Sequence, residues 1–393
     1  MTVTPLRPEI DFAYAPVPDL DEILDDFRDR GAVVPVLFHG QTTYLVTRYA
    51  AVRAAFADEE SFPAAAFHRV HAEPSMGRTM LGMVGDEHRR NRLLVSSSFL
   101  PSRVARYVDG PIREEAVRLV DALEGQGDVD LVEQLARPFP FSVITRLLGL
   151  PVEDEPLFLE WALKLIDYPW DPEGALKARS EFTEYLRPLL ERRRKEPEED
   201  VLSILATTEL EGQRLEDEEV FAFCRLLYAA GSDTGYKNLG SLLAAILQNP
   251  GMCELARESD TTREALVQEG LRWQAPVALQ PRTCRVGRTF EGVAIPSGAP
   301  MLFGITAANH DPELFSDPHR FDPHRPNSRQ HLSFGHGDHF CLGSHLARRE
   351  LEAGIKYLFE RFPDMELAPN AEIEFQGCVL RGPREVRVRL RPN

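Results

Sequence analysis

The sequence predicts a mainly α-helical fold with a smaller β part (α+β), organised as one domain over residues 1–393. Two observations favour this fold class. Apolar residues recur with helical spacing along most of the chain, whereas β-rich runs are confined to a few short stretches. Neither an internal repeat nor a linker divides the chain, and 43% of its residues are apolar, which is ample for a large buried core.

The expected elements follow in chain order. A short amphipathic helix over residues 19–30 ends at Gly31, and β-rich runs 33–38 and 42–47 around His39-Gly40 are typical of a hairpin. The long helix over residues 216–248 begins with an acidic first turn. The segment 309–333 shows neither the helical nor the strand periodicity of apolar residues. A long irregular segment of this kind is usually functional. The other expected helices are residues 49–58, 86–99, 103–124, 131–149, 155–167, 173–193, 199–207, 261–273 and 343–362, and the other strands lie within 277–303, 371–376 and 385–391.

Composition and charge exclude several classes of function. Asp and Glu number 62 against 45 Lys and Arg, a formal charge of −17. So acidic a chain is a poor general binder of nucleic acid or of an anionic membrane, because both attract positive surface. Residues 1–26 have no signal-peptide pattern, and no run of 18 apolar residues occurs. We therefore expect a cytoplasmic protein with no nucleic-acid and no membrane partner.

The most informative stretch is F-G-H-G-D-H-F-C-L-G, residues 334–343. Cys341 precedes an expected helix, whose dipole and backbone N–H groups favour a thiolate and so lower the pKa of its thiol. Gly335, Gly337 and Gly343 allow a flat cofactor to approach the backbone closely. No two cysteines have C-x-x-C spacing, which argues against structural zinc, whereas a single thiolate suits an axial ligand of haem iron. A small buried hydrophobe remains the interpretation of the other four cysteines, Cys224, Cys253, Cys284 and Cys378.

At these residues the sequence resembles the haem-thiolate monooxygenases of the cytochrome P450 superfamily, most closely the soluble bacterial members. The resemblance extends in motif order and spacing from about residue 10 to the C-terminus. It implies the cytochrome P450 fold, with haem b between the long central helix and the helix that follows the cysteine loop. It also implies that Cys341 binds the iron and that Phe334, Gly335 and Gly343 contact the cofactor.

The segment E-G-L-R places Glu269 and Arg272 one turn apart on a helix. By itself such a pair is usually a solvated surface pair. The resemblance implies a structural pair that is joined by an arginine of the irregular segment, Arg320 of D-P-H-R-F, and that holds the cysteine loop in place.

The middle of the long helix reads A-A-G-S-D-T-G, residues 229–235. Small residues there are typical of close packing against another helix. The alternative is that Ala230 and Gly231 leave room for haem and dioxygen, while the Thr234 hydroxyl bonds back to the Ala230 carbonyl. Asp233 and Thr234 then resemble the catalytic acid–alcohol pair that delivers protons to bound dioxygen. Gly235 stands where the family often has a second threonine.

Haem carries two propionates, which require cationic donors. His88 and Arg92 lie one turn apart on an expected helix, and the resemblance implies that they and Arg282 and His339 bind the propionates. Taken singly, each would more often be an ordinary surface cation.

The implied function is a haem-dependent monooxygenase that inserts one atom of O₂ into an apolar organic small molecule. No G-x-G-x-x-G fingerprint occurs, so electrons from NAD(P)H are expected through a separate ferredoxin or flavodoxin and its reductase. That partner would dock on the cations Arg89, Arg90, Arg348 and Arg349, and the protein itself is expected to be a monomer.

Two other functions remain open. A peroxygenase or isomerase would share the haem ligand, although such enzymes usually lack the acid–alcohol pair. A haem-based gas sensor or carrier would need no proton relay. The substrate is not identified, and steroids, terpenes, fatty acids and aromatics all remain possible. Its candidate contacts, each of which would equally suit core packing, are Phe67, Met80, Leu81, Val277 and Leu279.

Overall fold

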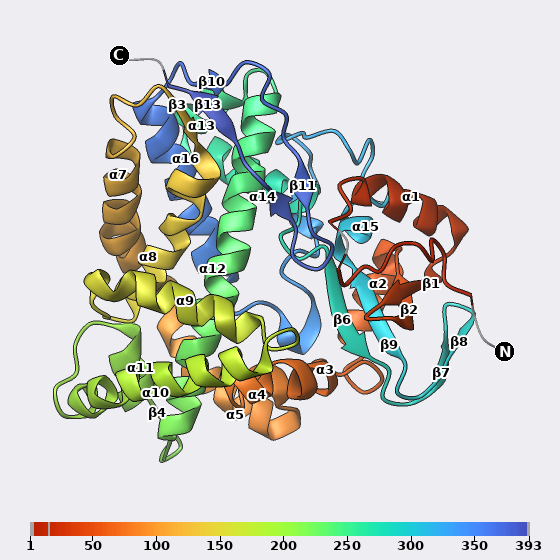
Figure 1. Ribbon diagram of the computed structural model, residues 1–393, viewed down its shortest axis with the longest axis horizontal. Coiled ribbons are helices and arrows are strands. Elements are labelled where there is room, and N and C mark those ends of the chain that lie inside the picture. Colours follow the sequence, from red (N-terminus) through yellow and green to blue (C-terminus); the bar gives the residue numbers. More distant parts are fainter. Residues whose placement is uncertain (1–3, 15, 391–393) are drawn as a thin grey trace.

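The computed structural model of the chain describes residues 4–14 and 16–390. It confirms a mainly helical fold with a smaller β part. Figure 1 shows most of the helices on one side of the molecule and the main sheet on the other, with α1, α2 and α15 beside the sheet. Among the described residues, no helix has the length and apolar character needed to cross a membrane. The helices are α1 (Leu20–Arg30), α2 (Tyr49–Ala57), α3 (Ala64–His71), α4 (Glu73–Met76), α5 (Gly85–Ser96), α6 (Pro101–Tyr107), α7 (Arg113–Asp121), α8 (Pro138–Leu147), α9 (Glu155–Ile166), α10 (Pro172–Lys195), α11 (Val201–Thr207), α12 (Asp217–Gln248), α13 (Met252–Glu258), α14 (Asp260–Trp273), α15 (Ile305–Asn309) and α16 (Ser344–Arg361).

The main sheet joins segments that are distant in sequence. Its strand order is β1-β2-β9-β6. The expected hairpin is confirmed as the antiparallel pair β1–β2, and β2 continues in parallel with β9, where Tyr44 pairs with Met301. The remaining strands form smaller sheets. The strands are β1 (Val33–Phe38), β2 (Gln41–Val46), β3 (Asp128–Asp130), β4 (Glu209–Leu210), β5 (Gln213–Arg214), β6 (Leu279–Thr283), β7 (Arg288–Phe290), β8 (Val293–Ile295), β9 (Pro300–Gly304), β10 (Glu366–Leu367), β11 (Phe375–Gln376), β12 (Gly382–Pro383) and β13 (Arg387–Arg389).

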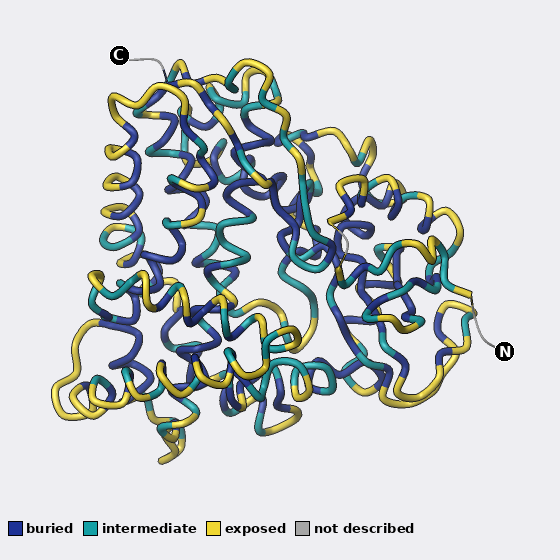
Figure 2. The backbone as a smooth tube through the Cα atoms, viewed as in Figure 1, coloured by how far each residue is buried: buried dark blue, intermediate teal, exposed yellow. Residues whose placement is uncertain are grey.

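The long helix α12 runs through the helical body and contacts α8, α9, α14 and α16. It begins with a capping box, in which the Glu216 N–H donates to Glu219 Oε2 at 2.9 Å. Most of its residues are buried, and exposed residues are concentrated on the outer helices and loops (Figure 2). The expected helix over residues 216–248 is thus confirmed within one residue.

Two expected helices are interrupted and several short ones were missed. Residues 131–149 form a π-helical turn, Val132–Ala136, followed by α8. Residues 103–124 form α6 and α7 with a π-helical turn between them, because Pro111 has no N–H to continue the helix and Gly110 leaves helical geometry. The short helices α3, α4, α13 and α15 were not expected. Helices this short depend on tertiary packing rather than on their own sequence pattern, so periodicity does not reveal them.

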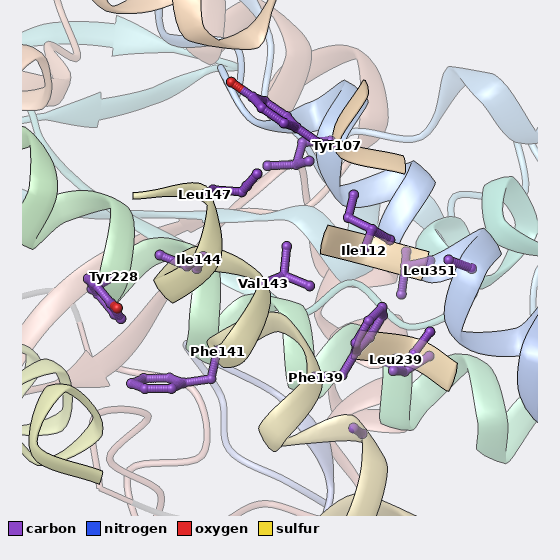
Figure 3. Close-up of a cluster of buried hydrophobic side chains, with 14 of the residues drawn as sticks. Tyr107, Ile112, Phe139, Phe141, Val143, Ile144, Leu147, Tyr228, Leu239 and Leu351 are labelled. Carbon is purple, nitrogen blue, oxygen red and sulfur yellow. The ribbon is translucent and has the colours of Figure 1, made fainter. Parts of the chain in front are cut away.

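Helix α8 is apolar on nearly all sides and packs against α12. Figure 3 shows its side chains Phe139, Val143 and Ile144 among residues from α12 and α16. Two glycines of α12 make this contact close. A Cβ on Gly231 would lie 2.6 Å from Ile144 Cδ1, and one on Gly235 would lie 2.8 Å from Pro140 Cβ.

These two glycines should tolerate substitution differently. Alanine favours a helix over glycine by about 1 kcal/mol, but a Cβ at position 235 meets the rigid Pro140 ring. We expect Gly235→Ala to lower the free energy of unfolding by about 1–2 kcal/mol through overpacking. Gly231→Ala is the matched control, because the terminal methyl of Ile144 can rotate away. Thermal and urea unfolding of both variants test this, and a Gly235→Ala protein as stable as the control would contradict it.

Candidate functional site

The cysteine loop is held in a compact turn before α16. The Cys341 N–H donates to the Phe334 carbonyl at 2.9 Å, and the Gly335 N–H donates to the Leu332 carbonyl at 2.8 Å. Gly337 has a φ of 76°, and a Cβ there would lie 2.9 Å from the Phe56 carbonyl oxygen. Glycine is therefore required at this position, both for its backbone conformation and for the close approach.

Cys341 is exposed, whereas Cys224, Cys284 and Cys378 are buried and Cys253 is partly buried. Desolvation by the surrounding protein raises the pKa of the Cys341 thiol, and the N–H groups of Gly343 and Ser344 oppose this rise. The N–H groups at the start of α16 thus lower the pKa of the thiol as expected, but desolvation is the larger effect in the protein alone, so the net shift is upward. A coordinated metal ion would reverse the balance, since coordination removes the thiol proton.

The middle of α12 has two distinct faces. Ala230 is exposed although its neighbours along the helix are mostly buried, and the Thr234 hydroxyl donates to the Ala230 carbonyl at 2.6 Å. Gly231 lies on the other face, against α8. The expectation that Gly231 leaves room for a cofactor was therefore wrong, and helix packing accounts for it. Ala230 and Thr234 remain on the open face.

Asp233 has a partner that the sequence analysis missed. The Lys237 ammonium, one turn further along α12, forms an ion pair with the Asp233 carboxylate. The same ammonium donates to Tyr236 Oη at 2.8 Å and lies 4.3 Å from the centre of the Tyr236 ring. The i, i+4 spacing of an acid and a base was the available signal.

Two arginines and two histidines lie beside the cysteine loop, and we call His88, Arg92, Arg282 and His339 the cationic cradle. The rings of His88 and His339 are 4.2 Å apart, and the charges of His88, Arg282 and Arg92 all act on His339. Arg92 Nη2 donates to the Phe340 carbonyl at 2.6 Å, which ties α5 to the loop.

The cradle has donors without acceptors. His88 Nε2 and His339 Nδ1 are buried, and neither has a hydrogen-bond partner among the described residues. Arg282 is 6% exposed, and Pro281 O at 2.9 Å is its one hydrogen-bond acceptor in the described part of the chain. Desolvation lowers the pKa of Arg282 to about 10 and that of His339 to about 3. Buried donors in this state favour an anionic ligand, so the cradle fits the two carboxylates of haem.

Two further ionisable residues at the cradle had no sequence signal. Desolvation and the nearby Arg282 lower the pKa of His68 to about 3. Glu59 Oε2 lies 3.6 Å from His339 Nε2. Both reach the cradle from segments between β2 and α5, and only the fold brings them there.

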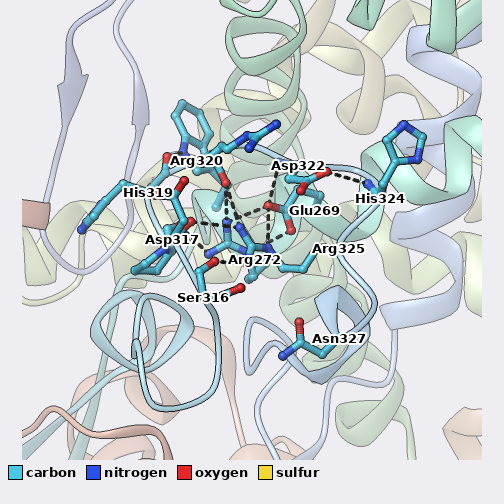
Figure 4. Close-up of polar contacts among 12 residues, drawn as sticks. Glu269, Arg272, Ser316, Asp317, His319, Arg320, Asp322, His324, Arg325 and Asn327 are labelled. Carbon is cyan, nitrogen blue, oxygen red and sulfur yellow. Dashed lines mark hydrogen bonds and ion pairs between the residues drawn. The ribbon is translucent and has the colours of Figure 1, made fainter.

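The expected structural pair is buried, and an arginine of the irregular segment joins it as predicted. Glu269 and Arg272 are both 0% exposed, and Arg272 Nη2 lies 2.7 Å from Glu269 Oε1. The third member is Arg325, whose Nε lies 3.2 Å from Glu269 Oε1 (Figure 4). The assignment of Arg320 was wrong: its side chain is exposed, and only its carbonyl takes part, accepting from Arg272 and Arg325. Because D-P-H-R occurs twice, at 317–320 and 322–325, the sequence offered two equivalent choices.

The four arginines expected to receive a partner are less available than predicted. Arg90 Nη2 lies 2.6 Å from Glu219 Oε1, and Arg349 Nη1 lies 2.6 Å from Glu352 Oε2. Arg348 is half-buried over the Phe334 ring. Arg89 alone of the four has a side chain that is mostly exposed, at 74%, and it pairs with Asp86, which is 92% exposed.

The candidate substrate contacts divide into open and buried residues. Phe67, Leu81 and Val277 keep part of their surface exposed. Leu279 is 0% exposed within the core of the main sheet, and Met80 is also buried. The burial of Leu279 and Met80 favours core packing over contact with a ligand in this conformation.

Comparison with known proteins gives consistent matches. The family model described as Cytochrome P450 matches residues 18–383. The 6-deoxyerythronolide B hydroxylase of Saccharopolyspora erythraea is 33% identical over 385 residues, covering 93% of this chain and 94% of that protein. The cytochrome P450 monooxygenase PikC of Streptomyces venezuelae is 33% identical over 90% of this chain and 86% of its own length. The solved structure of the bacillaene polyketide synthase cytochrome P450 PksS from Bacillus subtilis has a TM-score of 0.87 and 32% identity, covering 95% of this chain and 97% of that one.

The two D-P-H-R arginines provide a test of the structural assignment. Arg325→Ala removes one partner from the buried Glu269 carboxylate, so we expect unfolding to become easier by about 3–5 kcal/mol. Arg320→Ala, on the exposed side chain five residues earlier, should change stability little. Urea denaturation of both variants measures the difference, and equal stabilities would show that Arg325 is not the third member.

Proposed function

The chain belongs to the cytochrome P450 family, and we propose that it binds haem b beside the cysteine loop, with Cys341 Sγ as the protein ligand of the iron and the cationic cradle around the propionates. The chain is accordingly a haem-dependent monooxygenase that uses dioxygen and a redox partner to oxidise a small organic molecule. The match over residues 18–383 supports a single catalytic domain. We further propose that this domain acts as a monomer in the cytoplasm.

The observation that carries the haem proposal is the set of unsatisfied cradle donors. His88 Nε2 and His339 Nδ1 are buried without acceptors among the described residues, and Arg282 lacks an ion-pair partner there. They lie next to the loop that presents the exposed Cys341. A thiolate that can bind iron, beside donors for two carboxylates, suits a haem-thiolate site.

When bound, haem supplies the iron that binds and activates dioxygen. The chain's own residues would then position protons. Thr234 Oγ1 donates to the Ala230 carbonyl, which leaves its lone pairs free to accept a hydrogen bond from water or ligand. Asp233 would hold the proton that passes toward this hydroxyl, and it must release the Lys237 ammonium to do so. Lys237 would thus keep the acid in place between turnovers.

We propose that the electron donor is a separate ferredoxin or flavodoxin that docks beside the cysteine loop. Arg89 supplies exposed positive charge, and Leu93 and Phe340 are 53% and 38% exposed. An apolar contact with a limited charged rim would suit transient binding. All four predicted arginines, Arg89 included, have intramolecular partners, so charge alone is not the main attraction here.

The substrate we propose is an apolar small molecule that contacts Phe67, Leu81 and Val277. The Phe67 ring stacks on His71 with centroids 4.3 Å apart, and desolvation lowers the pKa of His71. A neutral imidazole and a phenyl ring favour an apolar ligand over a charged one.

The iron ligand can be tested directly. Cys341→His should abolish the red-shifted Soret band of the ferrous carbon monoxide complex, because that band requires a thiolate ligand. Cys253→Ser, at a partly buried cysteine away from the loop, is the control and should keep the band. A red-shifted band in Cys341→His would contradict the assignment.

Thr234 distinguishes a monooxygenase from the other two functions. We expect Thr234→Ala to keep the fold, because alanine favours a helix, but to lose coupling: NADPH oxidation continues while product per NADPH falls several-fold and hydrogen peroxide rises. Ser232→Ala, two residues earlier on α12, is the control and should stay coupled. A peroxygenase driven by added peroxide would depend little on Thr234, and a sensor would form no product. If Thr234→Ala formed as much product per NADPH as wild type, the proposed proton relay through Asp233 and Thr234 would be contradicted.

A further inference from the structure

We propose that Glu59 is an acidic member of the cationic cradle, which weakens the retention of haem and lowers its reduction potential. The inference rests on the proposed function, since it takes the haem propionates to lie against the cradle. The other members of the cradle can donate hydrogen bonds to the haem propionates, whereas the Glu59 carboxylate would repel them. The presence of Glu59 therefore requires a separate explanation.

The fold fixes the position of Glu59. It lies in the turn between α2 and α3, and Oε2 accepts the Ala64 N–H at 3.2 Å. Ala64 is the first residue of α3, so the carboxylate binds a free N–H at a helix N-terminus. Its side chain is 24% exposed. The acid is therefore held by the backbone and does not sample solvent freely.

Glu59 acts on the cradle at two points. Oε2 lies 3.6 Å from His339 Nε2, on the opposite side of the imidazole from the unpartnered Nδ1. The charge of Glu59 also acts on the buried Arg282. A propionate bound to His339 and Arg282 would thus lie near a carboxylate that acts on the same imidazole and guanidinium. Two negative charges held near each other repel, and more strongly in a partly desolvated site than in water.

The surrounding cavity supplies a matched comparison. A cavity of about 360 Å³ is lined by Glu59 and also by His88, His339 and the neighbouring Glu60. Glu60 is exposed, and its backbone carbonyl, not its carboxylate, accepts from Arg285 Nε at 3.1 Å. The two acids therefore border the same space, but only Glu59 is fixed against the cradle.

The first measurement is haem retention. Haem-loaded wild type, Glu59→Gln and Glu60→Gln are mixed with excess apomyoglobin, and haem transfer is followed by absorbance. Glutamine can still accept the Ala64 N–H, so the turn should persist. We expect Glu59→Gln to lose haem about three- to tenfold more slowly than wild type, and Glu60→Gln to match wild type. Glu59→Asp, which withdraws the carboxylate by one methylene, should fall between Glu59→Gln and wild type.

The second measurement is the reduction potential of the bound haem, which a merely structural role would not change. Ferrous haem carries one more negative charge than ferric haem, so removing a nearby negative charge stabilises the ferrous form relative to the ferric form. The midpoint potential of Glu59→Gln should therefore be more positive than that of Glu60→Gln. Faster haem loss from Glu59→Gln would show that the carboxylate supports His339 instead, and would overturn the proposal. Equal rates and potentials in the two variants would overturn it as well. If the wild-type protein takes up no haem, the proposed function itself fails.

Discussion

The buried ion pair between Glu269 and Arg272 is the interaction on which the rest of the site depends. Arg272 donates to the carbonyls of Asn309 and Pro318 as well as to Glu269. Arg325 repeats this arrangement on neighbouring carbonyls of the irregular segment. Backbone groups that have no helix or strand to satisfy them are thus paired by two guanidinium groups. The segment 309–333 can therefore be irregular and still rigid.

Hydrogen bonds connect this rigid segment directly to the cysteine loop. Asn309 Nδ2 donates to Ser333 Oγ at 2.9 Å, and the Leu332 N–H donates to Asn309 Oδ1 at 2.8 Å. Ser333 Oγ in turn donates to the Leu271 carbonyl at 2.6 Å. The start of the loop is consequently fixed to α14, the helix that carries Glu269 and Arg272. Removing one member of the buried pair would therefore loosen the cysteine loop without touching Cys341 itself.

The sequence predicted the parts of this arrangement that depend on local pattern. The periodicity of α12, the glycines around Cys341 and the E-x-x-R spacing each have a signature within a few residues. The roles of Arg320, Gly231 and Leu279 depend on tertiary packing, which a local sequence pattern does not reveal. Arg320 and Arg325 occupy equivalent motifs, and only the path of the chain selects one. Gly231 suited either a cofactor or a helix, and the position of Ile144 decides between them. Leu279 is apolar in either setting, and its place in the sheet core buries it.

The parallel pairing of β2 with β9 has a consequence for how the protein is made. The hairpin β1–β2 leaves the ribosome early, but the strand that completes its sheet includes Met301 and arrives late. At about 5–20 residues per second, the free edge of β2 waits for tens of seconds of synthesis. An unpaired edge of this kind is open to strand addition from other chains. The N-terminal hairpin is therefore open to aggregation during translation until β9 is made, although most of its residues are buried in the finished molecule.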